Sequence, residues 1–140
     1  LTLRYQVSAE AMFTDIRVEN GVLSYTFFTD KDSHCAQWFK STPCWTTDDL
    51  ETVEHALKSV ELEKLADLVD SSGVMALEGD AFGETNLRRR AYTETLTVNW
   101  GGAERVLRYR STPEAEGKPA AFTVLENTLR DYADALTSDK

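Results

Sequence analysis

The sequence predicts an α+β fold: an antiparallel sheet of two hairpins plus extra strands, covered on one face by two helices. Two glycine-containing turns, at 20–21 and 101–102, each join segments in which apolar and polar residues alternate. Two other segments, 60–72 and 119–136, carry apolar residues at helical spacing. With 140 residues the chain has the length of one domain, so we expect residues 1–140 to share a single core.

The first segments predict a strand and a hairpin. Residues 1–7, LTLRYQV, alternate between apolar and polar with the period of a half-buried strand. In residues 12–28, Asn20 and Gly21 suit a two-residue type I′ turn. That turn fixes a register with apolar pairs on one face: Val18 with Leu23, Ile16 with Tyr25, and Thr14 with Phe27.

Residues 50–57 carry two conflicting signals. Asp48 and Glu51 have the spacing of a capping box, which indicates a helix. The apolar residues of this segment, however, are out of phase with the helix that follows, by about a quarter turn at 3.6 residues per turn. We therefore expect a strand at 50–57.

The first helix is predicted from its apolar stripe and its ends. Ser59 is the expected N-cap, and acidic residues follow it in the first turn. Gly73 lies where a C′ glycine ends a helix. We expect a short apolar segment after Gly73 and then a polar loop over 78–90. The stripe of this helix consists of Leu62, Leu65, Leu68 and Val69.

The last third of the chain predicts a second hairpin and a second helix. The hairpin turns at Gly101-Gly102 and places Leu96 opposite Leu107 on an apolar face. Pro119 is expected at the first position of the helix. The other face of the hairpin carries Thr93, Thr95, Arg108 and Arg110, and the buried side of the helix carries Phe122, Leu125, Leu129, Tyr132 and Leu136.

Charge limits the classes of partner. The chain has 24 acidic against 15 basic residues and a net charge of −9. Nucleic acids and anionic membranes reward cationic surfaces, so we expect neither as a partner. No run approaches the roughly 18 apolar residues of a membrane helix, and we expect no membrane span. A cationic protein partner is compatible with this charge.

A dense segment, Ser33 to Trp45, holds both cysteines of the chain. A zinc site would recruit His34, Cys35, Cys44 and His55, but eight residues separate the cysteines instead of the two to four of a zinc knuckle. A C-x-x-C redox motif is absent, and no distant histidine supports a papain-like reading of Cys44-Trp45. We expect a Cys35–Cys44 disulfide, which contributes about 2.7 kcal/mol in the chain-entropy model.

The same segment predicts a compartment and a binding surface. A disulfide favours an extracytoplasmic protein, whether periplasmic, lipid-anchored or secreted. The chain begins at Leu1 without a signal peptide, as expected of a mature or a trimmed chain. Trp38, Phe39 and Trp45 either pack around the disulfide or serve as anchors for a partner.

Other candidate sites carry weaker signals. None of the common hydrolase, metalloprotease, phosphate-binding or dinucleotide-binding motifs occurs, so we expect neither an enzyme nor a cofactor. A loop with Glu78, Asp80, Glu84 and Asn86 offers oxygen ligands for calcium but lacks EF-hand spacing, and a solvated loop is the simpler interpretation.

Six arginines crowd 23 residues of this acidic chain. One interpretation is a solvated edge whose arginines pair with nearby acids. The other is a site for an anionic ligand or an acidic partner, formed by Arg90, Arg108 and Arg110, because arginine binds carboxylates in a bidentate manner. The remaining members of the group are Arg88, Arg89 and Arg105.

The layout also resembles a class of small exported bacterial domains. In these, a strand leads into a pattern similar to LKSVELEKLADLVDSSGVMAL, and a hairpin such as TLTVNWGGAERVLRY precedes a proline-led final helix. The likeness covers most of the chain from residue 12 onward. The emfourin family of metalloprotease inhibitors is loosely similar, although its glycine-rich N-terminal stretch is missing here. The resemblance implies an exported bacterial domain and carries over no site residues.

Two classes of function follow. The first is a non-enzymatic exported binding or inhibitor module that acts on a protein partner through the aromatic residues of the cysteine segment. The alternative is a binder of a small anionic ligand through the arginine-rich face of the second hairpin.

Overall fold

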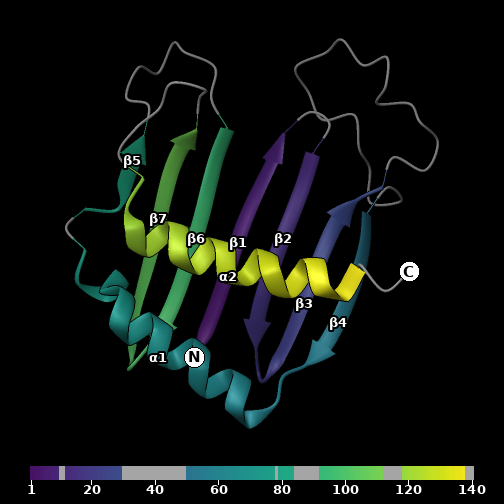
Figure 1. Ribbon diagram of the computed structural model, residues 1–140. Helices are drawn as coiled ribbons and strands as arrows, with labels where there is room; N and C mark the ends of the chain where they lie inside the picture. The colour runs from purple at the N-terminus through teal and green to yellow at the C-terminus, as the bar shows by residue number, and fades with distance from the viewer. Residues whose placement is uncertain (10–11, 30–49, 78, 84–91, 112–117, 138–140) are drawn as a thin grey trace.

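In a computed structural model, the described residues form an open seven-stranded sheet with two helices (Figure 1). Both helices lie on the same face of the sheet in Figure 1. The α+β class, the antiparallel hairpins and the two covering helices are therefore confirmed. The structure describes residues 1–9, 12–29, 50–77, 79–83, 92–111 and 118–137.

The first half of the sheet is a meander of four antiparallel strands. Asn20 and Gly21 have φ angles of 53° and 77°, as a type I′ turn requires, and the predicted register of the hairpin is confirmed. The strand expected at 50–57 is confirmed, since it pairs with its predecessor along its whole length. The strands are β1 (Thr2–Ala9), β2 (Met12–Glu19), β3 (Val22–Phe28) and β4 (Leu50–Ala56).

The second half of the sheet pairs with the edge of β1 that lies opposite β2. The order of the sheet is β4-β3-β2-β1-β6-β7-β5, so β1 lies at the centre. The hairpin of β6 (Tyr92–Trp100) and β7 (Ala103–Ser111) pairs Leu96 with Leu107, as predicted. The expected loop over 78–90 is wrong in part, because β5 (Ala81–Gly83) lies within it. This short strand runs parallel to β7 and was not visible as an alternating pattern.

The first helix, α1, spans Ser59–Ser72. Its N-cap is Lys58 and not the predicted Ser59. The Lys58 backbone N–H donates to Oε1 of Glu61, three residues later, at 3.0 Å, as the N-cap residue of a capping box does. The predicted C-terminal glycine is confirmed, as Gly73 adopts a φ of 75°. A short 3-10 turn, η3 (Val74–Ala76), follows and buries Val74.

The second helix, α2, spans Ala120–Thr137 and crosses the strands (Figure 1). It begins one residue later than predicted, and Pro119 contributes the carbonyl that accepts from the Thr123 N–H at 3.1 Å. Proline suits this place because the first N–H groups of a helix lack intrahelical partners.

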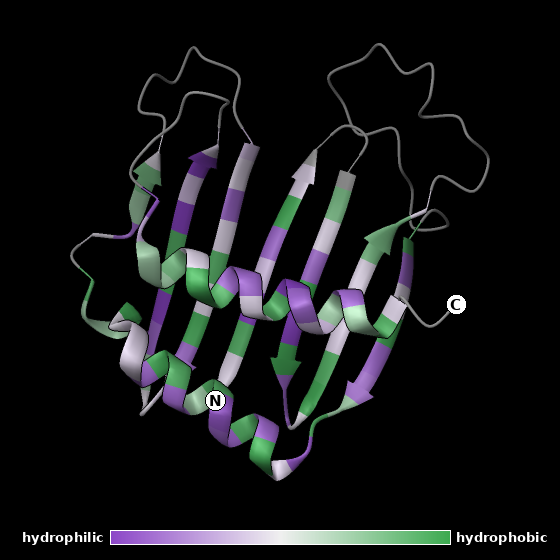
Figure 2. Cartoon of the chain, viewed as in Figure 1, coloured by the Kyte–Doolittle hydropathy of each residue, from purple (hydrophilic) through white to green (hydrophobic). Residues whose placement is uncertain are grey.

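One core fills the space between the sheet and the helices. Figure 2 shows the alternation of apolar and hydrophilic residues along the central strands, which directs every second side chain to the helices. Most of the apolar residues predicted on the two hairpin faces and the two helix stripes are buried. Those that are only partly buried at the margin of the core include Tyr25, Leu62, Leu68, Tyr132 and Leu136. The fully buried side chains with the largest volumes are Tyr5, Phe122, Leu3, Ile16, Leu23, Leu65, Leu96, Leu107, Leu125 and Leu129.

Within the parts of the chain described above, neither helix is long and apolar enough to cross a membrane.

Candidate binding surface

The sheet has one face that neither helix covers. We call it the uncovered face, and the opposite one the covered face. Because side chains alternate along a strand, the strands that bury Leu3, Ile16, Leu96 and Leu107 on the covered face direct their other residues outward. The residues on the uncovered face that carry hydroxyl groups are Thr2, Ser8, Ser24, Thr26, Thr52, Thr93, Thr95 and Thr97.

Two arginines of the uncovered face are neutralised within the sheet. Arg4 holds Asp15 through two hydrogen bonds, from Nε at 3.0 Å and from Nη2 at 2.8 Å. The hydrogen bonds to Asp15 raise the pKa of Arg4, and they outweigh the opposite effect of partial burial. Arg17 lies 3.8 Å from Glu19. These pairs remove most of the charge from the middle of the face.

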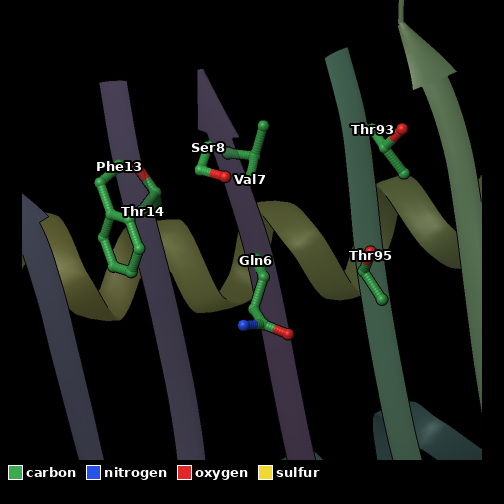
Figure 3. Close-up of a pocket in the computed structure, with 7 residues that line it drawn as sticks. All are labelled: Gln6, Val7, Ser8, Phe13, Thr14, Thr93 and Thr95. Atoms are coloured by element: carbon green, nitrogen blue, oxygen red, sulfur yellow. The ribbon is translucent and has the colours of Figure 1, made fainter. Parts of the chain in front are cut away.

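A shallow hollow lies on this face above β1. Its volume is about 190 Å³, and Gln6 and Ser8 line it between Phe13 of β2 and Thr93 and Thr95 of β6. Figure 3 looks onto this hollow with α2 passing behind the strands. As far as the described residues extend, the side chains of Gln6, Ser8, Thr93 and Thr95 form no hydrogen bond to another protein group. The hollow therefore presents hydrogen-bonding groups that are open to a ligand.

The two described arginines of the predicted anion site lie beside the hollow. Arg108 is directly opposite Thr95 across β6 and β7, and Arg110 is directly opposite Thr93. Arg108 is exposed and Arg110 is partly exposed. Arg90, the third arginine assigned to this site from sequence, lies outside the described residues.

Arg105 does not join the predicted anion site. Counting along β7 places it on the covered face with Leu107, whereas Arg108 lies on the uncovered face. Its guanidinium donates to the carbonyl oxygens of Met75 at 3.1 Å and Gly79 at 2.7 Å. Arg105 therefore ties β7 to the segment that follows α1. Arg88 and Arg89 lie outside the described residues.

An apolar strip borders the hollow on the other side. Phe13 of β2 pairs with Ser8 of β1, and Leu50 of β4 pairs with Phe28 of β3. These three apolar side chains are partly buried and follow the same edge of the uncovered face. Along this edge of the uncovered face, the half formed by β2, β3 and β4 is therefore apolar, and the half formed by β6 and β7 is cationic and rich in hydroxyl groups.

The covered face holds a cluster of ionised groups that we call the ionic cluster. Tyr5 donates to Glu94 at 2.5 Å and accepts from Arg130 Nη2 at 2.8 Å. Lys118 donates to Glu94 at 3.0 Å and also pairs with Glu126. Arg130 Nε donates to Glu126 at 2.9 Å. Two cations and two carboxylates thus balance one another under α2.

Burial and pairing oppose each other in the ionic cluster. Burial alone would raise the pKa of Glu126, but hydrogen bonds from Lys118 and Arg130 outweigh it and lower that pKa. Burial would lower the pKa of Lys118, yet its hydrogen bonds to Glu126 and Glu94 raise it. For Tyr5, burial and the hydrogen bond to Glu94 both raise the pKa, so the phenol stays protonated. Glu126 is therefore held ionised, Lys118 charged and Tyr5 protonated.

The sequence interpretation missed the ionic cluster, although signals for it exist. Glu94 stands two residues before Leu96 and so occupies a place on the apolar face of β6. Glu126 likewise falls within the buried stripe of α2 and is only 7% exposed. A carboxylate in an apolar stripe requires a buried partner, because an unpaired charge is costly there. The partners themselves could not be identified from residues so far apart in the sequence.

Several predicted site residues cannot be placed. The cysteine segment lies outside the described residues, and with it His34, Cys35, Cys44, Trp38, Phe39 and Trp45. Three of the four possible calcium ligands also lie outside them: Glu78, Glu84 and Asn86. His55, the fourth residue of the zinc alternative, lies on β4 with Nε2 3.8 Å from Glu61. Asp80 is exposed, and its carbonyl oxygen accepts from the Arg108 backbone N–H at 2.8 Å.

The described residues do not assemble a metal centre. Among them, no group of three or more histidine, aspartate or glutamate side chains converges on a point where an ion could lie. The groups that do converge are the donors around the hollow and the closed ionic cluster. The arrangement is thus suited to recognition by hydrogen bonds and charge.

Comparison with known protein families and with curated proteins gives no match to this chain.

Proposed function

We propose that this chain is a non-enzymatic binding module that acts on a protein partner through the uncovered face of its sheet. The observation that carries the proposal is that the whole face lacks a covering helix within the described residues. An amphipathic sheet normally packs one face on a core and leaves the other to solvent or to a partner. This face is polar enough to be soluble alone, and it carries an apolar strip for contact.

The dimensions of the face suit a protein partner. The seven described strands, about 4.8 Å apart, span about 29 Å. All of them except the short β5 have seven to nine residues and extend over about 23–30 Å. The face therefore offers roughly 700 Å², close to the roughly 800 Å² that each partner contributes to a standard interface. The partly buried Phe13, near the middle of one edge, supplies an aromatic anchor of the kind found at hot spots.

A small anionic ligand bound through Arg90, Arg108 and Arg110 is the alternative. The hollow beside Arg108 and Arg110 measures about 190 Å³, below the roughly 300–1,000 Å³ of small-molecule sites. It is also shallow, whereas such sites enclose most of the ligand. The protein partner is therefore the function that the geometry favours.

The cysteine segment adds to the same surface in this proposal. It joins β3 to β4, and the described residues at the ends of these strands include Phe28 and Leu50 of the apolar strip. We propose Trp38, Phe39 and Trp45, which belong to this segment of the sequence, as further anchors for the partner. The predicted disulfide and the likeness to exported bacterial domains support an extracytoplasmic location. A protease gene beside the gene for this chain would narrow the function to an inhibitor.

Site-specific photocrosslinking in the cells that make the protein tests the proposal. A photoreactive residue is placed at Ser24 or Thr97 on the uncovered face, and in control variants at Lys64 of α1 or Asn127 of α2, both exposed. We expect adducts of one discrete mass from the first pair and none of that mass from the controls. Adducts that form equally well from both sets, or from the helices alone, would overturn the proposed surface.

A further inference from the structure

We infer that the hollow and Arg108 together bind an acidic side chain of the protein partner. The inference rests on the proposed function and adds to it the chemistry that the partner presents. It follows from which arginines are neutralised, which polar groups lack partners, and how much space the hollow offers.

Arg108 is the cation that the proposal needs. On the same face, Arg4 is held by Asp15 and Arg17 lies beside Glu19. Arg108 is exposed, and no side chain in the parts of the chain that the structure describes forms an ion pair with it. Arg110 is already engaged in the protein, so it adds positive charge nearby without being required.

The groups between β1 and β7 form a row of donors. Gln6 pairs with Thr95 across β1 and β6, and Thr95 pairs with Arg108 across β6 and β7. Neighbouring strands are about 4.8 Å apart, so the long side chain of Arg108 can reach the rim of the hollow past Thr95. Hydroxyl, amide and guanidinium donors therefore approach the same space, which is the donor set that a carboxylate accepts from.

The polar groups around the hollow have no hydrogen-bond partner among the described residues. Thr26 and Thr52, elsewhere on the face, hydrogen-bond to each other at 2.8 Å. The side chains of Gln6, Ser8, Thr93 and Thr95 make no such bond to any residue that the structure describes. The neighbouring carboxylate of Asp15 is occupied by Arg4, so it does not compete for these donors.

The size and the rim of the hollow point to a side chain and not to a free ligand. About 190 Å³ holds roughly six water molecules at about 30 Å³ each, which matches one side chain and its nearest waters. Phe13 forms the opposite rim and offers an apolar contact. The partner is therefore expected to present an Asp or Glu next to an apolar residue.

Chemical-shift mapping with a matched pair of peptides tests the inference. The probes are two short capped peptides that differ only in one residue, Glu or Gln, beside a leucine. We expect the Glu peptide to shift the backbone amides of Ser8, Thr95 and Arg108, and to bind about tenfold more tightly than the Gln peptide. Arg108→Gln should remove that difference, and salt above about 0.1 M should reduce it by screening.

Arg17→Gln is the matched control, since Arg17 lies on the same face beside Glu19. It should leave the preference for the Glu peptide unchanged. Equal binding of both peptides, or no shift with either, overturns the inference, while photocrosslinks from Thr97 would still support the proposed function. If free glutarate binds as tightly as the Glu peptide, the hollow is a small-anion site and the protein side chain is the wrong source of the carboxylate.

Discussion

Glu126 is held on the covered face by the two cations beside it. Its lowered pKa, which hydrogen bonds from Lys118 and Arg130 cause against the effect of burial, means that folding favours the ionised form. Stability from this group is therefore fully present above the ordinary pKa of 4.5 and is lost as the pH falls through the lower pKa of the folded state. At neutral pH the ionic cluster is balanced.

Replacing this carboxylate should reveal its contribution. We expect Glu126→Gln to lower the free energy of unfolding at pH 7 by roughly 1–3 kcal/mol, because two cations lose a charged acceptor. The difference in free energy of unfolding between the variant and the native chain should narrow as the pH falls below about 4.5, because the carboxylate of the native chain then becomes protonated and loses its charge. Denaturant unfolding over a pH series measures both effects.

The control for this change is Glu104→Gln, at an exposed position of the second hairpin. It should cost less than about 0.5 kcal/mol at every pH. A gap that stays constant from neutral to acidic pH would show that the Glu126 variant acts through packing and not through its charge.

Cys35 and Cys44 carry a prediction that depends on sequence alone. As the only two cysteines of the chain, they are expected to be oxidised to a disulfide in the native compartment. Intact mass should rise by two hydrogen atoms on treatment with a reductant, and alkylation without reductant should label neither residue. A chain isolated with two free thiols would contradict both the bond and the proposed export.

At the scale of elements, each helix is attached to the sheet in a different way. α1 packs through apolar residues such as Leu65, and polar contacts add to this, among them the hydrogen bond from Trp100 Nε1 to Asp70 at 2.7 Å. α2 adds the ionic cluster to its apolar stripe, and Tyr5 and Phe122 meet edge to face with centroids 6.3 Å apart. Apolar packing should therefore dominate the contribution of α1.

Leu65→Ala tests that expectation. Leu65 is 1% exposed, so its truncation should cost roughly 2–5 kcal/mol, through lost burial and the cavity left behind. Val60→Ala on the same helix is the control, because Val60 is 53% exposed and alanine is the better helix former. If both variants unfold at the same denaturant concentration, the assignment of Leu65 to the core is wrong.

The short strand β5 depends on the lack of a side chain at Gly83. A Cβ there would overlap the carbonyl oxygen of Arg110 and lie 2.9 Å from its nitrogen, both of them backbone atoms that cannot move aside. We expect Gly83→Ala to detach β5 and to speed hydrogen exchange of the amides in β7 that face it. Gly79→Ala is a matched control, since it has a similar φ of 77° but nothing within 4 Å.

Equal effects of the two glycine variants would mean that backbone strain alone, and not the contact with Arg110, limits position 83. If strain alone acts, β5 should remain paired with β7 in both variants.

The elements that could be predicted from the sequence are those with local signals. Asn20-Gly21 fixes the first hairpin, and the alternation on either side fixes which face is buried. The parallel pairing of β5 and the central place of β1 could not be predicted, since partners far apart in sequence leave no local pattern. For the candidate site, alternation did place Arg108 and Thr95 on one face. The hollow beside them depends on the pairing of β1 with β6, which no local pattern gave.

At the scale of the whole molecule, the two faces of the sheet serve separate purposes. The covered face contains the core and the ionic cluster, while the uncovered face contains the hollow and the apolar strip. Substitutions at Thr95 or Arg108 should therefore alter binding with little loss of stability. Because residues for binding and residues for stability lie on different faces, variants of the uncovered face should remain folded while their binding is measured.

The central place of β1 also has a consequence for synthesis. β2, β3 and β4 follow β1 along the chain and neighbour one another in the sheet, so this meander can assemble as soon as it emerges. The other edge of β1 must wait for β6, which begins at Tyr92, and Tyr5 must wait for Arg130. Until then the middle of the future sheet is a free strand edge with apolar residues, the feature that invites pairing with other chains. A nascent or translocating chain therefore needs protection until its last helix has been delivered.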